Sequence, residues 1–350
     1  MTSPAPSPEP QMVDWGLAVA IGSKLAGEGP TVTRAEAGSV VAELRADAVR
    51  STGLVRDFTG LDAPDGTAPL LVVDRPGWVR ANAEGFKVAT GPMMRKLVEK
   101  REPHRISQMI GSKVTGAEVG GLLGFLAGKV LGQFDPFHDP AGRLLLVAPN
   151  IVHVERELDV DPSDFRLWVC LHEETHRVQF TAVPWMRDHL FSEIEAIGET
   201  LDPGSLLEGG LDRITDAIKA GRQGGSIIDM FSTPEQREIL DRVTGMMSLL
   251  EGHADVVMDD VGPQVIGSVK EIRAKFTKRR QGIGTLDRIL RRLLGLEAKM
   301  AQYRDGARFV RAVVDKVGMD EFNAVWAEPA HLPSKAELTD HDGWVRRVLG

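Results

Sequence analysis

The sequence predicts a mainly α-helical protein with a small β-sheet, an α+β fold in which helices dominate. Apolar residues recur at spacings of three and four along most of the chain, as amphipathic helices require. Two short apolar runs, at 70–73 and 143–148, are followed by turn residues and are predicted to be strands. The 350 residues suffice for one large domain or two modest ones, each with a sizeable core.

Composition narrows the class of protein. The formal net charge of -8 argues against a general nucleic-acid-binding protein. Cys170 is the single cysteine, so no disulfide can form within the chain, and a reducing cytoplasmic location is expected. Residues 1–11 are rich in Pro, Ser and Ala, which predicts a disordered tail rather than a secretory signal. The most apolar stretch, 114–133, carries Glu118 and Lys129, so no stable membrane insertion is expected.

The N-terminal region, 12–140, is expected to be helical with one short strand. Helical spacing covers 15–59, the strand at 70–73 follows, and another helix is expected over 79–94. Five glycines then recur at every fourth residue and would form one stripe on a helix: Gly116, Gly120, Gly124, Gly128 and Gly132. Because glycine is a poor helix former, the stripe indicates another backbone packed closely against this helix. Helix dimerisation in a membrane is the less favoured explanation.

The second region, 141–350, contains the strand 143–148 and is otherwise expected to be helical. Asp161 followed by Pro162 indicates a helix start, with the aspartate as N-cap and the proline in the first turn. This helix is expected to run to about Thr181, and Pro184 marks its end. Further helical patterns cover 192–200, 211–220, 234–260, 269–276, 286–317 and 320–325. The sequence GRQGGS at 221–226 indicates a flexible loop and is a candidate lid.

The helix predicted to begin at Pro162 carries the motif H-E-x-x-H, from His172 to His176. Residues four apart lie on one helix face, so the two histidines can hold one tetrahedral zinc ion, Zn2+. Glu173 lies beside the first histidine, and in this motif it acts as the general base for an attacking water. Two histidines without a metal are the alternative, but the motif lies on an amphipathic helix that follows a strand, which is the context it requires.

A catalytic zinc site needs a third protein ligand. Gln179 and Ala182 stand where the extended motif, H-E-x-x-H-x-x-G-x-x-H, has its glycine and its third histidine, so that ligand must come from elsewhere. The best candidate is Glu251, which shares a helix face with Asp255. In this prediction Glu251 binds the metal and Asp255 accepts a hydrogen bond from a ligand histidine. The competing candidates are His189, Glu193, Glu195 and His253.

Two residues are candidates for stabilising the oxyanion that forms on a substrate carbonyl, namely Tyr303, the only tyrosine, and His253. A tyrosine is more often a core or rim residue than a catalytic one. Cys170 precedes the first histidine by two positions, so it faces away from the metal and is expected to be buried in the core.

Longer strings in the sequence resemble one family of zinc peptidases. The strings are VDWGLAVAIG, HEETHRVQF, PWMRDHL, LLEGHAD, RRLLGLEAKMAQYRDGARFV and FNAVW. Together they resemble the zincin-like metallopeptidase type 2 family, an actinobacterial group with a branch associated with biosynthesis of the deazaflavin coenzyme. The motif with its distant glutamate and aspartate is also similar to the gluzincin pattern. The resemblance implies a zincin-like core, a small sheet whose edge strand lies above the metal helix. It implies His172, His176 and Glu251 as ligands and Glu173 as general base.

These features predict a zinc-dependent hydrolase, a metallopeptidase that acts on a peptide or protein substrate. An extended peptide is expected to pair with the strand 143–148 by strand addition. The main alternative is a non-proteolytic zinc-binding protein with a regulatory or scaffold role in coenzyme metabolism. A weaker alternative, binding to an anionic membrane surface, rests on the basic residues between 275 and 292, which more commonly form a solvated helix face.

Overall fold

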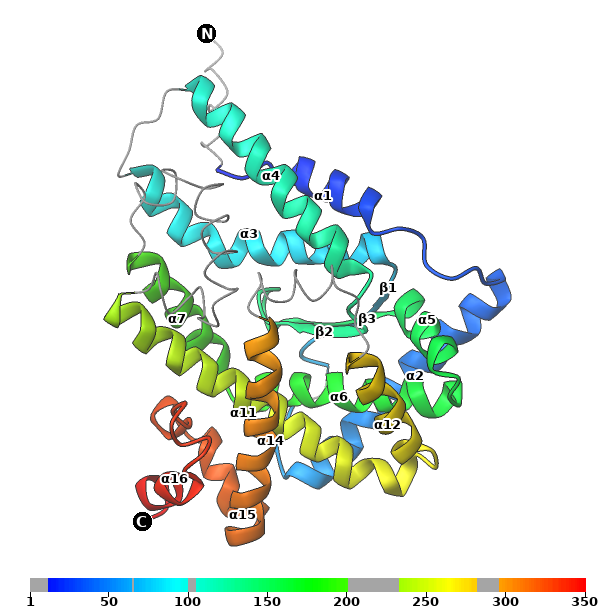
Figure 1. Ribbon diagram of the computed structural model, residues 1–350, viewed down its shortest axis with the longest axis vertical. Coiled ribbons are helices and arrows are strands. Elements are labelled where there is room, and N and C mark those ends of the chain that lie inside the picture. Colours follow the sequence, from blue (N-terminus) through cyan, green and yellow to red (C-terminus); the bar gives the residue numbers. More distant parts are fainter. Residues whose placement is uncertain (1–11, 65, 100–104, 201–232, 282–295) are drawn as a thin grey trace.

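A three-stranded sheet lies at the centre of the structure, and helices cover both of its faces (Figure 1). The computed structural model describes residues 12–64, 66–99, 105–200, 233–281 and 296–350. The strands are β1 (Leu70–Val73), β2 (Gly132–Asp135) and β3 (Arg143–Val147), in the order β1-β3-β2. β1 pairs with β3 in parallel, and β2 pairs with β3 in antiparallel fashion. The predicted α+β fold, mainly helical with a small sheet, is therefore confirmed, and both predicted strands are present.

The helices form a layer on each face of the sheet (Figure 1). One layer contains α1 (Trp15–Leu25), α3 (Arg75–Glu99) and α4 (Arg105–Ala127). The other contains α2 (Arg34–Thr59), α6 (Pro162–Ala182), α11 (Pro234–Val265) and α14 (Leu296–Val317). The remaining elements are α5 (Ala148–Leu158), α7 (Met186–Thr200), α12 (Val269–Gln281), α15 (Met319–Phe322), η1 (Asn323–Trp326), η2 (Pro329–His331) and α16 (His341–Val348). Among these described helices, none has the length and apolar character that a membrane span requires.

The central strand β3 explains why helices pack on both faces of the sheet. Every residue of β3 is buried, and successive side chains of a strand point to opposite faces. Leu145 and Val147 join an apolar cluster with residues of α3 and α4, whereas Leu146 joins the main core with α2, α6 and α11. Because β3 is paired on both sides, it has no free edge. The prediction that a substrate peptide pairs with the strand 143–148 is therefore wrong.

The edge strand β2 was not predicted from the sequence. Its four residues, GQFD, lack the alternation of buried and exposed positions that identifies a strand. Their extended conformation depends on pairing with β3. β1 and β2 come from the predicted region 12–140, and β3 comes from the predicted region 141–350. The two regions therefore share one sheet.

The glycine stripe is only partly helical. In α4, the glycines leave no room for a Cβ against α1; a Cβ on Gly120 would lie 2.6 Å from the carbonyl oxygen of Ala18. A Cβ on Gly124 would lie 2.9 Å from the carbonyl oxygen of Gly22, and one on Gly116 would lie 2.6 Å from that of Asp14, the N-cap of α1. The predicted close approach of another backbone is therefore confirmed for these three glycines. Gly128, however, follows the end of α4, and Gly132 begins β2, so the prediction of a single helical stripe through all five glycines is wrong.

Helix α6, which carries the H-E-x-x-H motif, begins as the sequence predicts. The Asp161 carboxylate accepts a hydrogen bond of 2.9 Å from the backbone N–H of Asp164, which satisfies a donor of the first turn. Pro162 occupies the first helical position, where its missing N–H costs nothing. The helix then runs to Ala182 through the middle of the core (Figure 1).

Helices α11 and α14 pack with their backbones in contact. A Cβ built on Gly306 of α14 would overlap the carbonyl oxygen of Ser248, and a Cβ on Gly252 would overlap the backbone of Gly306. Any side chain at either position forces the helices apart, because backbone atoms cannot rotate away as a side chain can. Gly252 follows Glu251 directly, so this contact fixes the position of the turn that carries Glu251.

We expect the substitution Gly306→Ala to lower the free energy of unfolding by about 1–3 kcal/mol, the usual cost of overpacking. Gly53→Ala is the matched control, because Gly53 is an exposed helical glycine of α2 and a Cβ added to it would meet no atom within 4 Å. The control should raise the free energy of unfolding by about 0.5–1 kcal/mol, since alanine is the better helix former. Urea unfolding of both variants measures the two effects. Equal or higher stability of Gly306→Ala would contradict the close packing of α11 and α14.

Candidate metal centre

Helix α6 presents two imidazoles to one point in space. His172 and His176 lie four residues apart, and their Nε2 atoms are 3.3 Å apart. The rings are nearly perpendicular, with centroids 4.8 Å apart. Two nitrogen ligands at about 2.0–2.1 Å from a tetrahedral zinc ion lie ~3.3 Å from each other, so this spacing suits a shared zinc ion.

Glu251 of α11 completes a three-ligand group. Its Oε2 lies 3.6 Å from Nε2 of His172 and 3.7 Å from Nε2 of His176. Among the residues that the structure describes, these three form the group of His, Cys, Asp or Glu side chains whose ligand atoms lie within 4.8 Å of one another. Two neutral nitrogens and one carboxylate oxygen are a common donor set of catalytic zinc sites. The residues therefore fit a zinc ion in chemistry and spacing.

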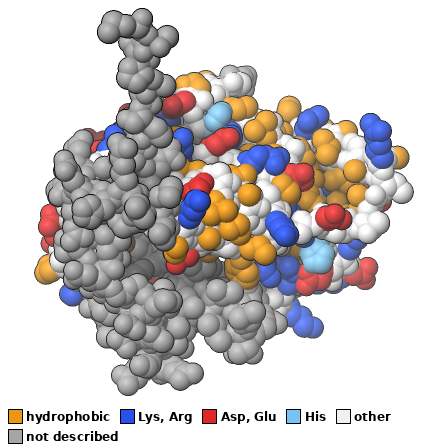
Figure 2. Space-filling model, turned by 90° about the horizontal axis from the view of Figure 1, so that it is seen from above, with side chains coloured by type: hydrophobic (Ala, Val, Ile, Leu, Met, Phe, Trp, Pro, Cys, Tyr) orange, Lys and Arg blue, Asp and Glu red, His pale blue; other side chains and the backbone are white. Residues whose placement is uncertain are grey.

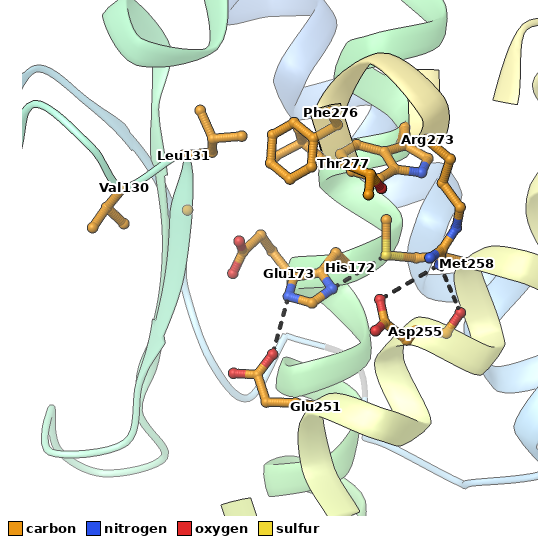
Figure 3. Close-up of a pocket in the computed structure, with 13 residues that line it drawn as sticks. Val130, Leu131, His172, Glu173, Glu251, Asp255, Met258, Arg273, Phe276 and Thr277 are labelled. Atoms are coloured by element: carbon orange, nitrogen blue, oxygen red, sulfur yellow. Dashed lines mark hydrogen bonds and ion pairs between the residues drawn. The ribbon is translucent and has the colours of Figure 1, made fainter. Parts of the chain in front are cut away.

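Glu173 lies beside this group but faces the sheet. Figure 3 shows its carboxyl on the side of His172 that faces β2, away from Asp255 and Met258. A Cβ on Gly132 would lie 2.6 Å from Cγ of Glu173, so β2 approaches this carboxyl closely only because residue 132 is glycine. Burial raises the pKa of Glu173 to about 8, although the neighbouring His176 acts in the opposite direction. A buried carboxyl with a raised pKa beside a candidate metal site has the properties of a general base.

The second ring nitrogen of each histidine also has a defined neighbour. Nδ1 of His172 lies 3.2 Å from Sδ of Met258, and Nδ1 of His176 lies 3.0 Å from Oε1 of Gln179. In metal sites, the group bound to the second nitrogen fixes the orientation of the ring. Met258, Gln179 and Gly132 were not predicted from the sequence to belong to the site.

The group opens into a cavity of about 360 Å³. His172, Glu173 and Glu251 lie on its polar side, and its apolar wall comes from Leu131, Trp168, Met258 and Phe276. The cavity lies between the residues that precede β2, helix α6, helix α11 and helix α12 (Figure 3). It has room for a substrate side chain next to the candidate metal position.

Asp255 lines the same cavity one turn after Glu251. Its carboxylate lies 3.4 Å from Nη2 of Arg273 on α12, and its backbone carbonyl accepts a bond of 3.1 Å from the same nitrogen. A carboxylate of Asp259 also pairs with Arg273. Asp255 therefore ties α11 to α12 at the cavity, and its hydrogen bond to a ligand histidine stays a prediction.

The competing ligand candidates lie in other surroundings. Glu193 on α7 forms a pair of hydrogen bonds, 2.9 and 2.8 Å, with Arg242, and His189 is 4.0 Å from the same carboxylate. Glu195 is exposed on the same helix. His253 is fully buried, and burial lowers its pKa to about 3, so its ring is neutral. None of the four belongs to the three-ligand group in the described part of the chain.

The other predicted features have different outcomes. Cys170 is buried in the main core, as predicted, and burial raises its pKa. Tyr303 lies on α14, but its side chain is outside the described part of the structure. The predicted tail, residues 1–11, and the candidate lid, residues 221–226, also lie outside it. Of the basic residues between 275 and 292, Lys275 pairs with Glu271 and Arg279 pairs with Glu157. Residues 282–292 lie outside the described part of the structure. On the face shown in Figure 2, the described basic and acidic side chains are interspersed.

We expect zinc affinity to fall as the pH falls below about 9. Burial alone would lower the pKa of His176, but the carboxylate of Glu251 raises it to about 9, so the metal-free ring is protonated at neutral pH. Zinc binds only the unprotonated nitrogen and must displace this proton, which predicts about tenfold weaker binding for each unit of pH below that value. Competition titrations against a chelator at pH 6, 7 and 8 measure this slope. A zinc affinity that does not change with pH would contradict the predicted displacement.

Comparisons with known proteins identify a family and a solved structure that this chain resembles. The model of the zincin-like metallopeptidase family matches residues 13–345. A crystal structure from Chloroflexus aurantiacus, described as that of a proposed hydrolase with a novel fold, is 31% identical in sequence with a TM-score of 0.72. The similarity covers 96% of this chain and 98% of that chain. No curated protein matches. These similarities support a hydrolase that holds a metal ion, and the chain belongs to the zincin-like metallopeptidase family.

Proposed function

We propose that this protein is a zinc-dependent peptidase in which Glu173 is the general base. The observation that carries the proposal is the meeting of two histidines and one distant glutamate, His172, His176 and Glu251, beside a cavity that the buried carboxyl of Glu173 also lines. His172, His176 and Glu251 would hold the zinc ion. When bound, zinc lowers the pKa of water and polarises a carbonyl group, which is the chemistry that peptide hydrolysis requires.

Glu173 moves the proton in this reaction. Its carboxylate takes a proton from the attacking water and delivers it to the nitrogen of the leaving amine. In the metal-free protein burial keeps the pKa of Glu173 at about 8, so the carboxyl is mostly protonated at neutral pH. A divalent cation held by the neighbouring ligands would favour the charged form of this carboxyl, the form that accepts a proton. The close approach of Gly132 leaves this carboxyl few alternative positions.

The edge strand β2 is the proposed docking site for an extended peptide. Leu131 accepts a hydrogen bond of 2.8 Å from Val147 of β3, so residues 131, 133 and 135 face β3. The backbone groups of Gly132 and Phe134 then point away from β3, where an added strand pairs. Since Gly132 also contacts Glu173, a peptide paired here passes beside the general base. This assignment replaces the central strand β3 with β2, which is an edge strand of the sheet in the described part of the chain.

The experiment is digestion of a peptide library by the zinc-loaded protein, with cleavage products identified by mass spectrometry. We expect cleavage that stops when a chelator removes the metal and returns when zinc is added back. Absence of cleavage across the library by protein that holds one zinc ion would overturn the peptidase proposal. That result would favour the non-proteolytic alternative, a regulatory or scaffold role. The finer resemblance to the branch associated with the deazaflavin coenzyme, like the cytoplasmic location, stays a prediction.

A further inference from the structure

A buried amide lies between the two helices that carry the candidate ligands. Gln179 is fully buried on α6, three residues after His176. Its Oε1 lies 3.0 Å from Nδ1 of His176. Its Nε2 lies 3.0 Å from the carbonyl oxygen of Leu250 and 3.0 Å from Nδ1 of His253, both on α11. One side chain therefore connects a candidate ligand to the turn of α11 that contains Glu251.

The chemistry of these neighbours fixes which way the amide faces. The carbonyl oxygen of Leu250 can only accept a hydrogen bond, so the atom that faces it must be the NH2 nitrogen of Gln179. The amide oxygen then faces His176, and because this oxygen can only accept, His176 must carry a proton on Nδ1. Nε2 of His176 is thereby the nitrogen left for the metal, on the side of Glu251.

His253 holds the second N–H of the amide. Its Nδ1 accepts this bond, which places the proton of the neutral ring on Nε2. The ring is fully buried and stacks on Phe322, with centroids 5.8 Å apart, so it cannot turn freely. With both N–H groups bonded to fixed partners on α11, the amide of Gln179 cannot exchange its oxygen and nitrogen without losing both bonds.

We propose that Gln179 is a positioning residue that sets the ring orientation and the protonated nitrogen of His176, and so prepares Nε2 for the metal. This inference rests on the proposed zinc site. An amide suits the position because it accepts from an imidazole and donates twice to acceptors. A carboxylate at position 179 keeps the hydrogen bond to His176 but places an oxygen against the carbonyl oxygen of Leu250. An apolar side chain at this position makes no hydrogen bond to His176 or to Leu250.

The test uses Co2+ as the probe metal, because its visible absorption reports the geometry of the ligands as well as affinity. Gln179→Met keeps the length of the side chain but removes the amide, and we expect about 10- to 100-fold weaker Co2+ binding with a changed absorption band. Gln179→Glu keeps an oxygen toward His176 and should recover most of that affinity, even if its free energy of unfolding is lower. If Gln179 only joins α6 to α11, Gln179→Met and Gln179→Glu should bind Co2+ equally poorly. That result would overturn the proposal.

Thr175→Val is the matched control. Thr175 is also fully buried on α6, but its hydroxyl donates to Leu171 of the same helix, at 2.7 Å. Its substitution should leave Co2+ affinity and the absorption band unchanged even where it lowers the melting temperature. Wild-type affinity in Gln179→Met would overturn the positioning role alone, whereas failure of the wild type to bind Co2+ would overturn the metal site itself.

A measurement on the wild type gives the same answer if Gln179→Met does not fold. Nitrogen NMR of the zinc-loaded protein is expected to show the imidazole proton of His176 on Nδ1 and slow exchange of that proton with water. Metal bound at Nδ1, or rapid exchange of the proton, would overturn the proposal.

Discussion

Substituting Glu173 with glutamine is expected to leave zinc binding intact and to slow peptide hydrolysis by about 10²- to 10⁴-fold, the range that general acid–base catalysis contributes. Glutamine has the same shape but cannot accept the proton of the attacking water. The carboxyl of Glu173 is not among the three ligand atoms, so its loss should not release the metal. Zinc content and the cleavage rate of a library peptide, measured on the same preparation, test both halves of this expectation.

Glu174→Gln is a close control for this experiment. Glu174 is the next residue on the same helix and is fully buried, but its carboxylate bonds to Arg177 at 2.7 Å and to Thr52 of α2 at 3.1 Å. It thus faces the interface with α2 and not the cavity. This variant should keep both zinc and hydrolysis, although loss of a buried charge pair should lower its stability. Similar rate losses in the two variants would contradict the special role of Glu173.

Removal of a predicted ligand should have the second large effect. Loss of a residue that only hydrogen-bonds to a ligand weakens metal binding by about 10- to 100-fold. We expect the zinc affinity of His176→Ala and of Glu251→Ala to fall by more than this. The reason is that zinc is left with two protein ligands, too few for a stable catalytic site. Elemental analysis after gel filtration measures zinc per chain.

Glu195→Ala provides the comparison, because Glu195 is a rival ligand from the sequence that lies exposed on α7. It should keep one zinc ion per chain. Loss of zinc in His176→Ala together with full retention in Glu251→Ala would assign the third ligand to another residue.

The part of the site that could be predicted from sequence is the part that depends on local geometry. The cap at Asp161 and the four-residue spacing of His172 and His176 follow from helix periodicity, and both appear in the structure as expected. Glu251 comes about 75 residues after His176, so periodicity could suggest it but could not bring the two helices together. That proximity depends on packing, including the backbone contact between α11 and α14 at Gly252.

The parts that were missed depend on tertiary contacts. β2 is a strand because β3 lies beside it, and four residues with one glycine give no such signal by themselves. From its spacing, Gly132 was predicted to belong to the helical glycine stripe. In the structure it lies in β2, and its lack of a side chain leaves room for the carboxyl of Glu173. Gln179 stood out only as a departure from the extended motif, yet its spacing of three from His176 places it on the same helix face. That spacing is the signal that the sequence did contain.

In the proposed site, one zinc ion is held jointly by α6 and α11. The most direct measurement is anomalous diffraction at the zinc absorption edge from crystals of the zinc-loaded wild-type protein. The structure predicts a single strong peak about 2.0–2.2 Å from Nε2 of His172, Nε2 of His176 and a carboxylate oxygen of Glu251. A peak bound by His189 and Glu193 instead, or the absence of any peak between the two imidazoles, would contradict it.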